Sequence, residues 1–132
     1  MTDSNRPLSP HLQVYKWRVH MVTSIMHRAT GAALVVGMLL FVWWLGSISY
    51  GAESYATFVG FIKSWFGRLV LFGITFSLLQ HMASGIRHLY MDKGDLLDLP
   101  SNRKSAMITY VFSGVTTLII WAYAYGMMEV LA

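Results

Sequence analysis

Three long stretches of this chain carry almost no charge, and they set its hydrophobic pattern. Residues 29–52 and 105–128 contain no charged side chain, and residues 69–86 form a third uncharged run. Apolar residues also precede that third run, where they are interrupted mainly by Lys63 and Arg68. As a helix, the first run would extend about 36 Å, which is enough to cross a bilayer core of about 30 Å. The pattern therefore predicts three transmembrane helices.

The predicted spans cover residues 22–48, 60–88 and 104–129, and a polar segment, residues 1–21, precedes them. The third span is entered through residues 100–102, where proline blocks continuation of the preceding helix and serine or asparagine can cap the next one. A chain of 132 residues with three spans has no room for a separate soluble module. We therefore expect residues 1–132 to form a single membrane-anchor domain.

Composition supports an all-α membrane protein. The chain is 55% hydrophobic and only 12% charged, whereas soluble domains are about a quarter charged. It contains no cysteine, which excludes disulfides, thiolate-bound iron-sulfur clusters and covalently attached c-type haem in this chain. Residues 1–21 lack a short apolar core followed by a small-residue cleavage site, so we expect no secretory signal. The basic residues belong to the ends of the spans, so we expect the lipid bilayer as a partner and no nucleic acid.

The distribution of lysine and arginine predicts the orientation. Eight of the ten flank the start of the first span or lie between the second and third spans. Only Lys63 and Arg68 lie on the other side. By the positive-inside rule, the N-terminus is cytoplasmic and the C-terminus is periplasmic.

A stripe of polar and small residues runs along the second predicted span. His81 and His88 are two helical turns apart and project from nearly the same side, with Ser84 and Gly85 between them. Such a stripe leaves a shallow groove with a nitrogen ligand, which suits a flat cofactor. The alternative is an ordinary contact between membrane helices, because small and polar residues also line those contacts.

The predicted topology brings the start of the first span to the same depth as this stripe. Ser24 and Arg28 are four residues apart and share one helix face, with His27 beside them. We therefore expect a hydroxyl, a cation and imidazoles to converge between two helices. Each has a simpler interpretation: Arg28 can extend to lipid headgroups, His27 and His88 can be interfacial, and Ser24 can bond its own helix.

Three motifs give the chain a specific resemblance. They are Arg6-Pro7-Leu8-Ser9-Pro10-His11-Leu12-Gln13, then Ser24-Ile25-Met26-His27-Arg28 with Gly31, then His81 with Gly85, Arg87, His88, Leu89 and Asp92. In this order and on these spans, they resemble the cytochrome b subunits of succinate dehydrogenase over essentially the whole chain. With no transit peptide before Arg6, the bacterial branch and its inner membrane are expected.

The resemblance implies a haem b-binding membrane anchor that pairs with a second small membrane anchor subunit. Together the two anchors would hold the iron-sulfur subunit and the flavoprotein subunit, and electrons from succinate would reach ubiquinone near the membrane face. By motif position, His81 is the axial ligand of the haem iron, and His27, Arg28 and His88 are expected at the haem propionates. Ser24 and Arg28 match the ubiquinone site. Succinate oxidation would belong to another subunit, so this chain would carry no catalytic residue for it.

Geometry bears on the second axial ligand. His81 and His88 stand about 10 Å apart along one helix and point the same way, so they cannot bind one iron from opposite faces. His27 is possible in principle but lies nearer the interface, and a histidine from the second anchor fits better. Two alternatives stay open: a haem-less quinone-binding anchor of a fumarate reductase-type complex, and a small multi-pass protein without a redox role.

Overall fold

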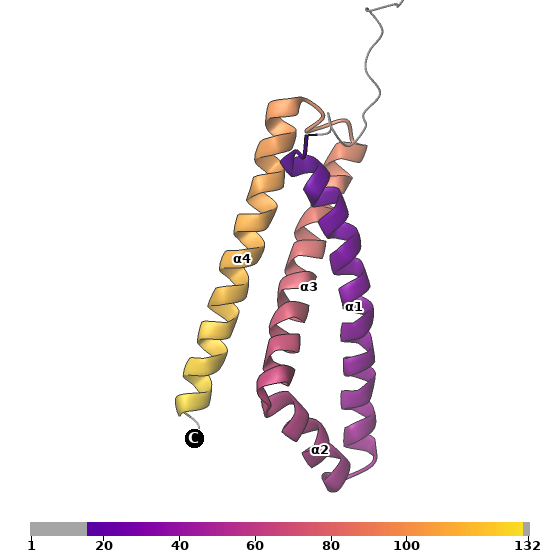
Figure 1. Cartoon of the computed structure of the whole chain (residues 1–132), viewed down its shortest axis with the longest axis vertical. Coiled ribbons are helices and arrows are strands. Elements are labelled where there is room, and N and C mark those ends of the chain that lie inside the picture. The colour runs from indigo at the N-terminus through magenta and orange to yellow at the C-terminus, as the bar shows by residue number, and fades with distance from the viewer. Residues whose placement is uncertain (1–15, 131–132) are drawn as a thin grey trace, which may run out of the picture.

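The structure, a computed structural model, describes residues 16–130 as four α-helices. They are α1 (Val19–Ser49), α2 (Ala52–Lys63), α3 (Trp65–Asp92) and α4 (Leu99–Val130) (Figure 1). No strand occurs in this described part of the chain. The helices long and apolar enough to cross a membrane are Met21–Ser49, Trp65–Asp92 and Leu99–Met127. The predicted all-α membrane fold with three spans is confirmed. The first sequence motif, residues 6–13, lies outside the described residues.

The segment expected as a second continuous span, residues 60–88, is divided into two helices. α2 and α3 meet at Ser64, whose backbone is extended and whose hydroxyl accepts the N–H of Gly67 at 3.0 Å. This bond caps the start of α3. A Cβ at Gly67 would overlap the carbonyl oxygen of Phe61, so glycine allows the two helices to turn this closely. α2 consequently leaves the axis of α3 (Figure 1).

The third span starts earlier than the sequence suggested. α4 begins at Leu99, and the carboxylate of Asp98 accepts the N–H of Ser101 at 3.0 Å. Asp98 is therefore the cap, in place of the expected serine or asparagine, and Pro100 sits in the first turn, where its missing N–H costs nothing. The bond from the Ser101 N–H is the main cause that lowers the pKa of Asp98. The side chain of Asn102 is therefore not needed as the helix cap and can bind other groups.

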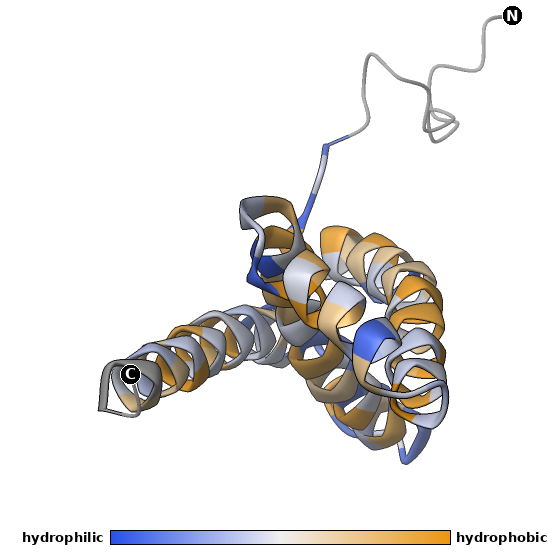
Figure 2. Cartoon of the chain, turned by 90° about the horizontal axis from the view of Figure 1, so that it is seen from below, coloured by the Kyte–Doolittle hydropathy of each residue, from blue (hydrophilic) through white to orange (hydrophobic). Residues whose placement is uncertain are grey.

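α3 is the central helix of the bundle. It packs against α1 on one side and α4 on the other (Figure 1). Viewed from below, α4 extends away from the group formed by α1, α2 and α3 (Figure 2). The start of α1 leans toward the start of α4, and the α3–α4 loop lies at the same end (Figure 1).

The interior of the bundle is polar and the exterior is apolar. Ala106 is the buried hydrophobic residue among those described. The buried polar and charged residues are Thr23, Thr30, Ser47, Ser77, Gln80, Ser84, Arg87, Thr109, Ser113 and Thr117. Small hydroxyl residues allow helices to approach closely, and their hydroxyls bond backbone carbonyls of the same helix, as Ser113 and Thr117 do. Large apolar side chains face outward, as expected for a protein surrounded by lipid.

Candidate functional site

The site lies where α1 crosses α3, and His27 joins the two helices. The Nδ1 atom of His27, on α1, lies 2.7 Å from the hydroxyl oxygen of Ser84, on α3. Ser84 is fully buried, and its hydroxyl donates to the carbonyl of Gln80 at 2.7 Å. Since the hydroxyl proton is used in that bond, the oxygen accepts from His27, and we assign the His27 proton to Nδ1. His27 is thereby fixed by the small-residue stripe of α3.

His81 makes the reciprocal contact from α3 to α1. Its Nδ1 lies 3.1 Å from the backbone carbonyl oxygen of His27 and 3.4 Å from the hydroxyl oxygen of Thr30. A carbonyl oxygen can only accept, so Nδ1 carries the proton and donates it. Nε2 is then unprotonated, and it has no hydrogen-bond partner among the residues that the structure describes. Such a nitrogen is chemically able to bind a metal ion.

Gly31 makes room for the ring of His81. A Cβ at Gly31 would lie 3.1 Å from Cε1 and 3.5 Å from Nδ1 of His81. The first distance is closer than an ordinary van der Waals contact. Thr30, one residue earlier, is 3% exposed, and its hydroxyl donates to the Met26 carbonyl at 2.8 Å, which leaves a lone pair facing the imidazole. Thr30 and Gly31 therefore form the surface of α1 that contacts the His81 ring.

The three candidate histidines of the two spans form one cluster. The rings of His27 and His81 are stacked, with centroids 4.0 Å apart and planes 10° apart. His88 meets His27 edge to face, with centroids 5.0 Å apart. The cluster does not form a metal site by itself, because no group of three or more ligands with suitable geometry occurs among the described residues.

Ser24 and Arg28 are placed differently. Ser24 is half-buried and Arg28 is exposed, and neither side chain makes a hydrogen bond or ion pair within the described part of the chain. The expected convergence of imidazoles between α1 and α3 is thus present, but the hydroxyl and the cation are not drawn into it. Both groups remain available to something outside this chain.

Arg87 has a role that the sequence reasoning missed. It is only 5% exposed, and its guanidinium donates from Nε to the Ser105 hydroxyl at 3.0 Å and from Nη2 to the Asn102 side-chain oxygen at 2.8 Å. Asn102 in turn donates to the Leu96 carbonyl at 3.1 Å. Arg87 therefore ties α3 to the start of α4 through neutral partners. The sequence marks Arg87 as part of the third motif and as a cation near the membrane boundary, but not its partners on α4.

Gln80 is a second group without a sequence signal. Its side chain is fully buried between α3 and α4, and Nε2 donates weakly to the Thr109 hydroxyl at 3.4 Å. Its Oε1 has no partner among the described residues. A neutral amide inside an apolar helix belongs to no charge pattern, whereas the imidazole of the neighbouring His81 is a recognisable metal ligand.

The fold and the cluster define the class of the protein: a three-span helical membrane protein with histidines held between two spans. The chain belongs to the succinate dehydrogenase/fumarate reductase transmembrane subunit family, whose model matches residues 2–120. This confirms the family indicated by the sequence motifs.

Curated relatives agree with the family. The chain is 40% identical over 120 residues to the succinate dehydrogenase cytochrome b556 subunit of Paracoccus denitrificans, with 89% of this chain and 92% of the relative covered. It is 35% identical over 119 residues to the mitochondrial cytochrome b560 subunit of Sus scrofa, with 87% of this chain and 69% of the relative covered. The cytochrome b556 subunit of Rickettsia felis is 29% identical over 118 residues, with coverage of 89% and 92%.

Proposed function

We propose that this chain is a haem b-binding membrane anchor of a succinate dehydrogenase, and that His81 is the axial ligand it contributes. The observation that carries the proposal is the bond from His81 Nδ1 to the His27 carbonyl oxygen at 3.1 Å. Metal-binding histidines nearly always donate their other ring nitrogen to a carbonyl or carboxylate, which fixes the tautomer and raises ligand basicity. In this structure, the contacts of His81 within the chain already fix its Nδ1 in this way.

The residues present fit a haem on two further counts. Nε2 of His81 has no competing partner among the described residues, and Gly31 removes the side chain that would press on the ring. When bound, a b-type haem supplies a centre that takes up and releases single electrons. The task of this chain is to hold one imidazole in a fixed orientation and to exclude a second tautomer.

The second axial ligand belongs, in this proposal, to the second membrane anchor subunit. His27 and His81 are stacked face to face with centroids 4.0 Å apart, so their nitrogens do not oppose each other across a space that holds a porphyrin. His27 is also fixed to Ser84 through Nδ1. We assign His27 and His88, with Arg28, to the haem propionates, where imidazole and guanidinium donors suit carboxylates. Because the Nδ1 proton of His27 is used on Ser84, His27 would donate to a propionate from Nε2 as the imidazolium.

Ser24 and Arg28 are proposed to bind ubiquinone, the substrate of the membrane part. Their side chains take no part in hydrogen bonds within the described chain, so their donors are free for a quinone carbonyl. A carbonyl oxygen gains negative charge as the quinone is reduced, and a fixed cation and hydroxyl stabilise that charge more than they stabilise the oxidised ring. In this proposal, Ser24 and Arg28 orient the quinone and lower the barrier to its reduction.

The same proposal assigns the remaining parts of the assembly. The iron-sulfur and flavoprotein subunits dock on the face where α1 begins, and succinate is oxidised in the flavoprotein subunit rather than in this chain. The N-terminus is cytoplasmic, the C-terminus is periplasmic, and the membrane is a bacterial inner membrane. The distribution of lysine and arginine and the bacterial relatives support this placement.

A reduced-minus-oxidised absorption spectrum of the purified complex tests the ligand assignment. We expect a b-type spectrum in the wild type that is lost in His81→Ala and retained in Met82→Ala, a matched control whose side chain is exposed on a different side of α3 from the histidine contacts. Recovery of the spectrum on adding imidazole to His81→Ala would show that the ligand, rather than the fold, was lost.

Two results would refute the proposal. A wild-type complex without any b-type spectrum would favour a haem-less anchor of the fumarate reductase type. A chain that purifies without flavoprotein or iron-sulfur subunits would favour a multi-pass protein without a redox role.

A further inference from the structure

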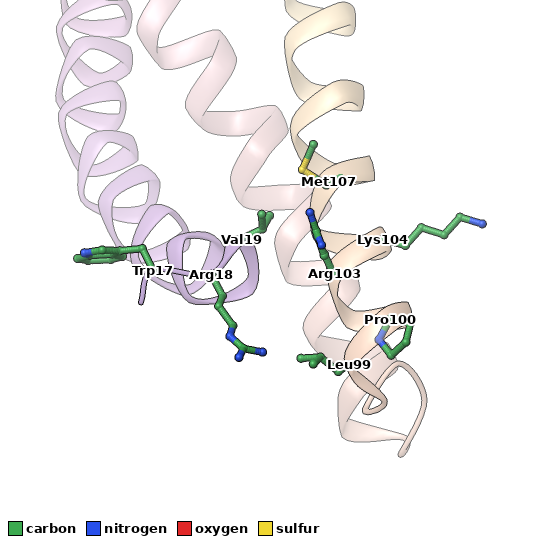
Figure 3. A pocket seen from close by; sticks show the side chains of 8 residues that line it. All are labelled: Trp17, Arg18, Val19, Leu99, Pro100, Arg103, Lys104 and Met107. Atoms are coloured by element: carbon green, nitrogen blue, oxygen red, sulfur yellow. The ribbon is translucent and has the colours of Figure 1, made fainter. Parts of the chain in front are cut away.

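A cavity opens between the start of α1 and the start of α4, at the end of the bundle away from α2. Its volume is about 790 Å³, and it is lined by Trp17, Arg18, Val19, Leu99, Pro100, Arg103, Lys104 and Met107. None of these residues belongs to the histidine cluster. Figure 3 shows Arg18 extending from the start of α1 and Arg103 from α4, with the cavity between them and Lys104 reaching outward.

The charge on the cavity wall has one sign. Three of the eight lining residues, Arg18, Arg103 and Lys104, are cations, and none is acidic. The nearest acidic neighbour in sequence, Asp98, directs its carboxylate to the N–H of Ser101. No hydrogen bond from Arg18, Arg103 or Lys104 to another side chain occurs among the described residues. Arg18 and Arg103 thus offer guanidinium donors to an occupant, whereas Lys104 reaches outward.

The rest of the wall is apolar and continues into the membrane. Leu99 and Met107 are exposed large apolar residues at the cavity, and Val111, one helical turn beyond Met107 on the same face of α4, is also exposed. Arg103 and Lys104 lie near the start of the span Leu99–Met127, and Val111 lies about two helical turns deeper in the same span. An occupant that satisfies both parts carries a negative group at the membrane surface and a hydrocarbon chain below it.

We propose that this cavity binds an anionic phospholipid, with the headgroup phosphate between Arg18 and Arg103 and an acyl chain along Met107 and Val111. Basic pockets between membrane helices recognise acidic lipid headgroups in this way. A free phosphate ion would use the cations but not the apolar track, and an acidic protein segment would not need the track to continue toward the bilayer centre. The inference depends on the membrane spans and not on haem or quinone binding.

Native mass spectrometry of the assembled complex tests the proposal. The delipidated complex in detergent is titrated with phosphatidylglycerol and, separately, with phosphatidylcholine of the same chain length. We expect phosphatidylglycerol to be retained preferentially. Each cation near a membrane surface contributes about a fivefold factor in affinity. Arg103→Gln should therefore weaken retention about fivefold, and Arg18→Gln combined with Arg103→Gln about 25-fold.

Lys93→Gln is the matched control, because it removes the same charge at the same end of the bundle outside the cavity. Its retention of phosphatidylglycerol should equal that of the wild type. The proposal fails if both lipids are retained equally, or if Lys93→Gln lowers retention as much as Arg103→Gln. Competition by inorganic phosphate at equal concentration would instead identify a small-anion site. Loss of a protein subunit from the variants, with lipid retention unchanged, would identify a subunit interface.

Discussion

Gly31→Ala is the substitution that most directly tests how α1 holds His81. The added Cβ would lie 3.1 Å from Cε1 of the ring, whereas ordinary contacts begin at 3.4 Å. The ring must therefore move away by at least a few tenths of an ångström. The bond from Nδ1 to the His27 carbonyl, now 3.1 Å, would lengthen toward the limit of hydrogen bonding.

Gly31→Ala has two opposing effects on the stability of the complex but a single effect on the haem midpoint potential. Weakening a hydrogen bond costs about 1 kcal/mol, and alanine is favoured over glycine in a helix by a similar amount. The stability of the complex should hardly change. With His81 as the proposed haem ligand, a weaker bond at Nδ1 would make the imidazole a poorer donor to iron, which would disfavour the oxidised haem. The haem midpoint potential should therefore rise, by at most about 40 mV if the full 1 kcal/mol is expressed.

Redox titration of the haem absorption measures this shift. Gly73→Ala is the matched control: Gly73 lies on α3, and a Cβ there would meet nothing within 4 Å. It should leave the potential unchanged. If Gly31→Ala has the same potential as the wild type and Gly73→Ala, the contact with α1 does not tune His81, and the inference that α1 positions this ligand is wrong.

Three other predictions follow from the site and the bundle. Ser24→Ala and Arg28→Ala should keep the haem spectrum and succinate oxidation with an artificial acceptor, yet lose roughly a hundredfold to a thousandfold of ubiquinone reduction, or less where water substitutes; wild-type rates with ubiquinone would place the quinone elsewhere. Arg87→Leu should lower the free energy of unfolding by about 1 to 3 kcal/mol because the Asn102 oxygen loses its donor. In a double-mutant cycle measured by unfolding in mixed micelles, adding Asn102→Leu should restore part of that loss. Additive losses would show that the bond contributes no coupling. Expression without the second membrane anchor should yield little haem-loaded, folded chain by absorption and size exclusion, and a stable isolated chain with bound haem would contradict the shared site.

The number of spans could be predicted from the sequence because lipid imposes a simple rule on composition. Uncharged runs of sufficient length have few alternatives to a membrane helix. The break at Ser64 follows another rule: it depends on one hydroxyl cap and on the close approach of Gly67 to Phe61. Neither feature changes the hydropathy of the segment, so the pattern of apolar residues predicted one continuous span across Ser64.

The site was predictable only in part, for a related reason. Helical periodicity places His81 and His88 on one face, and the topology brings His27 to a similar depth. The acceptor for His81, however, is a backbone carbonyl, which every residue has and no motif marks. The partners of Arg87 are also neutral side chains on another helix, so no charge pattern pointed to them.

The capped break at Ser64 separates two parts of the chain that can tolerate different changes in length. An extra residue within α2 would be absorbed where the chain turns, and α3 would still start from the same cap. An extra residue between Trp65 and His81 would instead turn everything beyond it by about 100° around the helix axis. His81 would then face away from α1. Insertions and deletions should therefore accumulate before Ser64 in relatives that keep the histidine and be absent from the stretch between them.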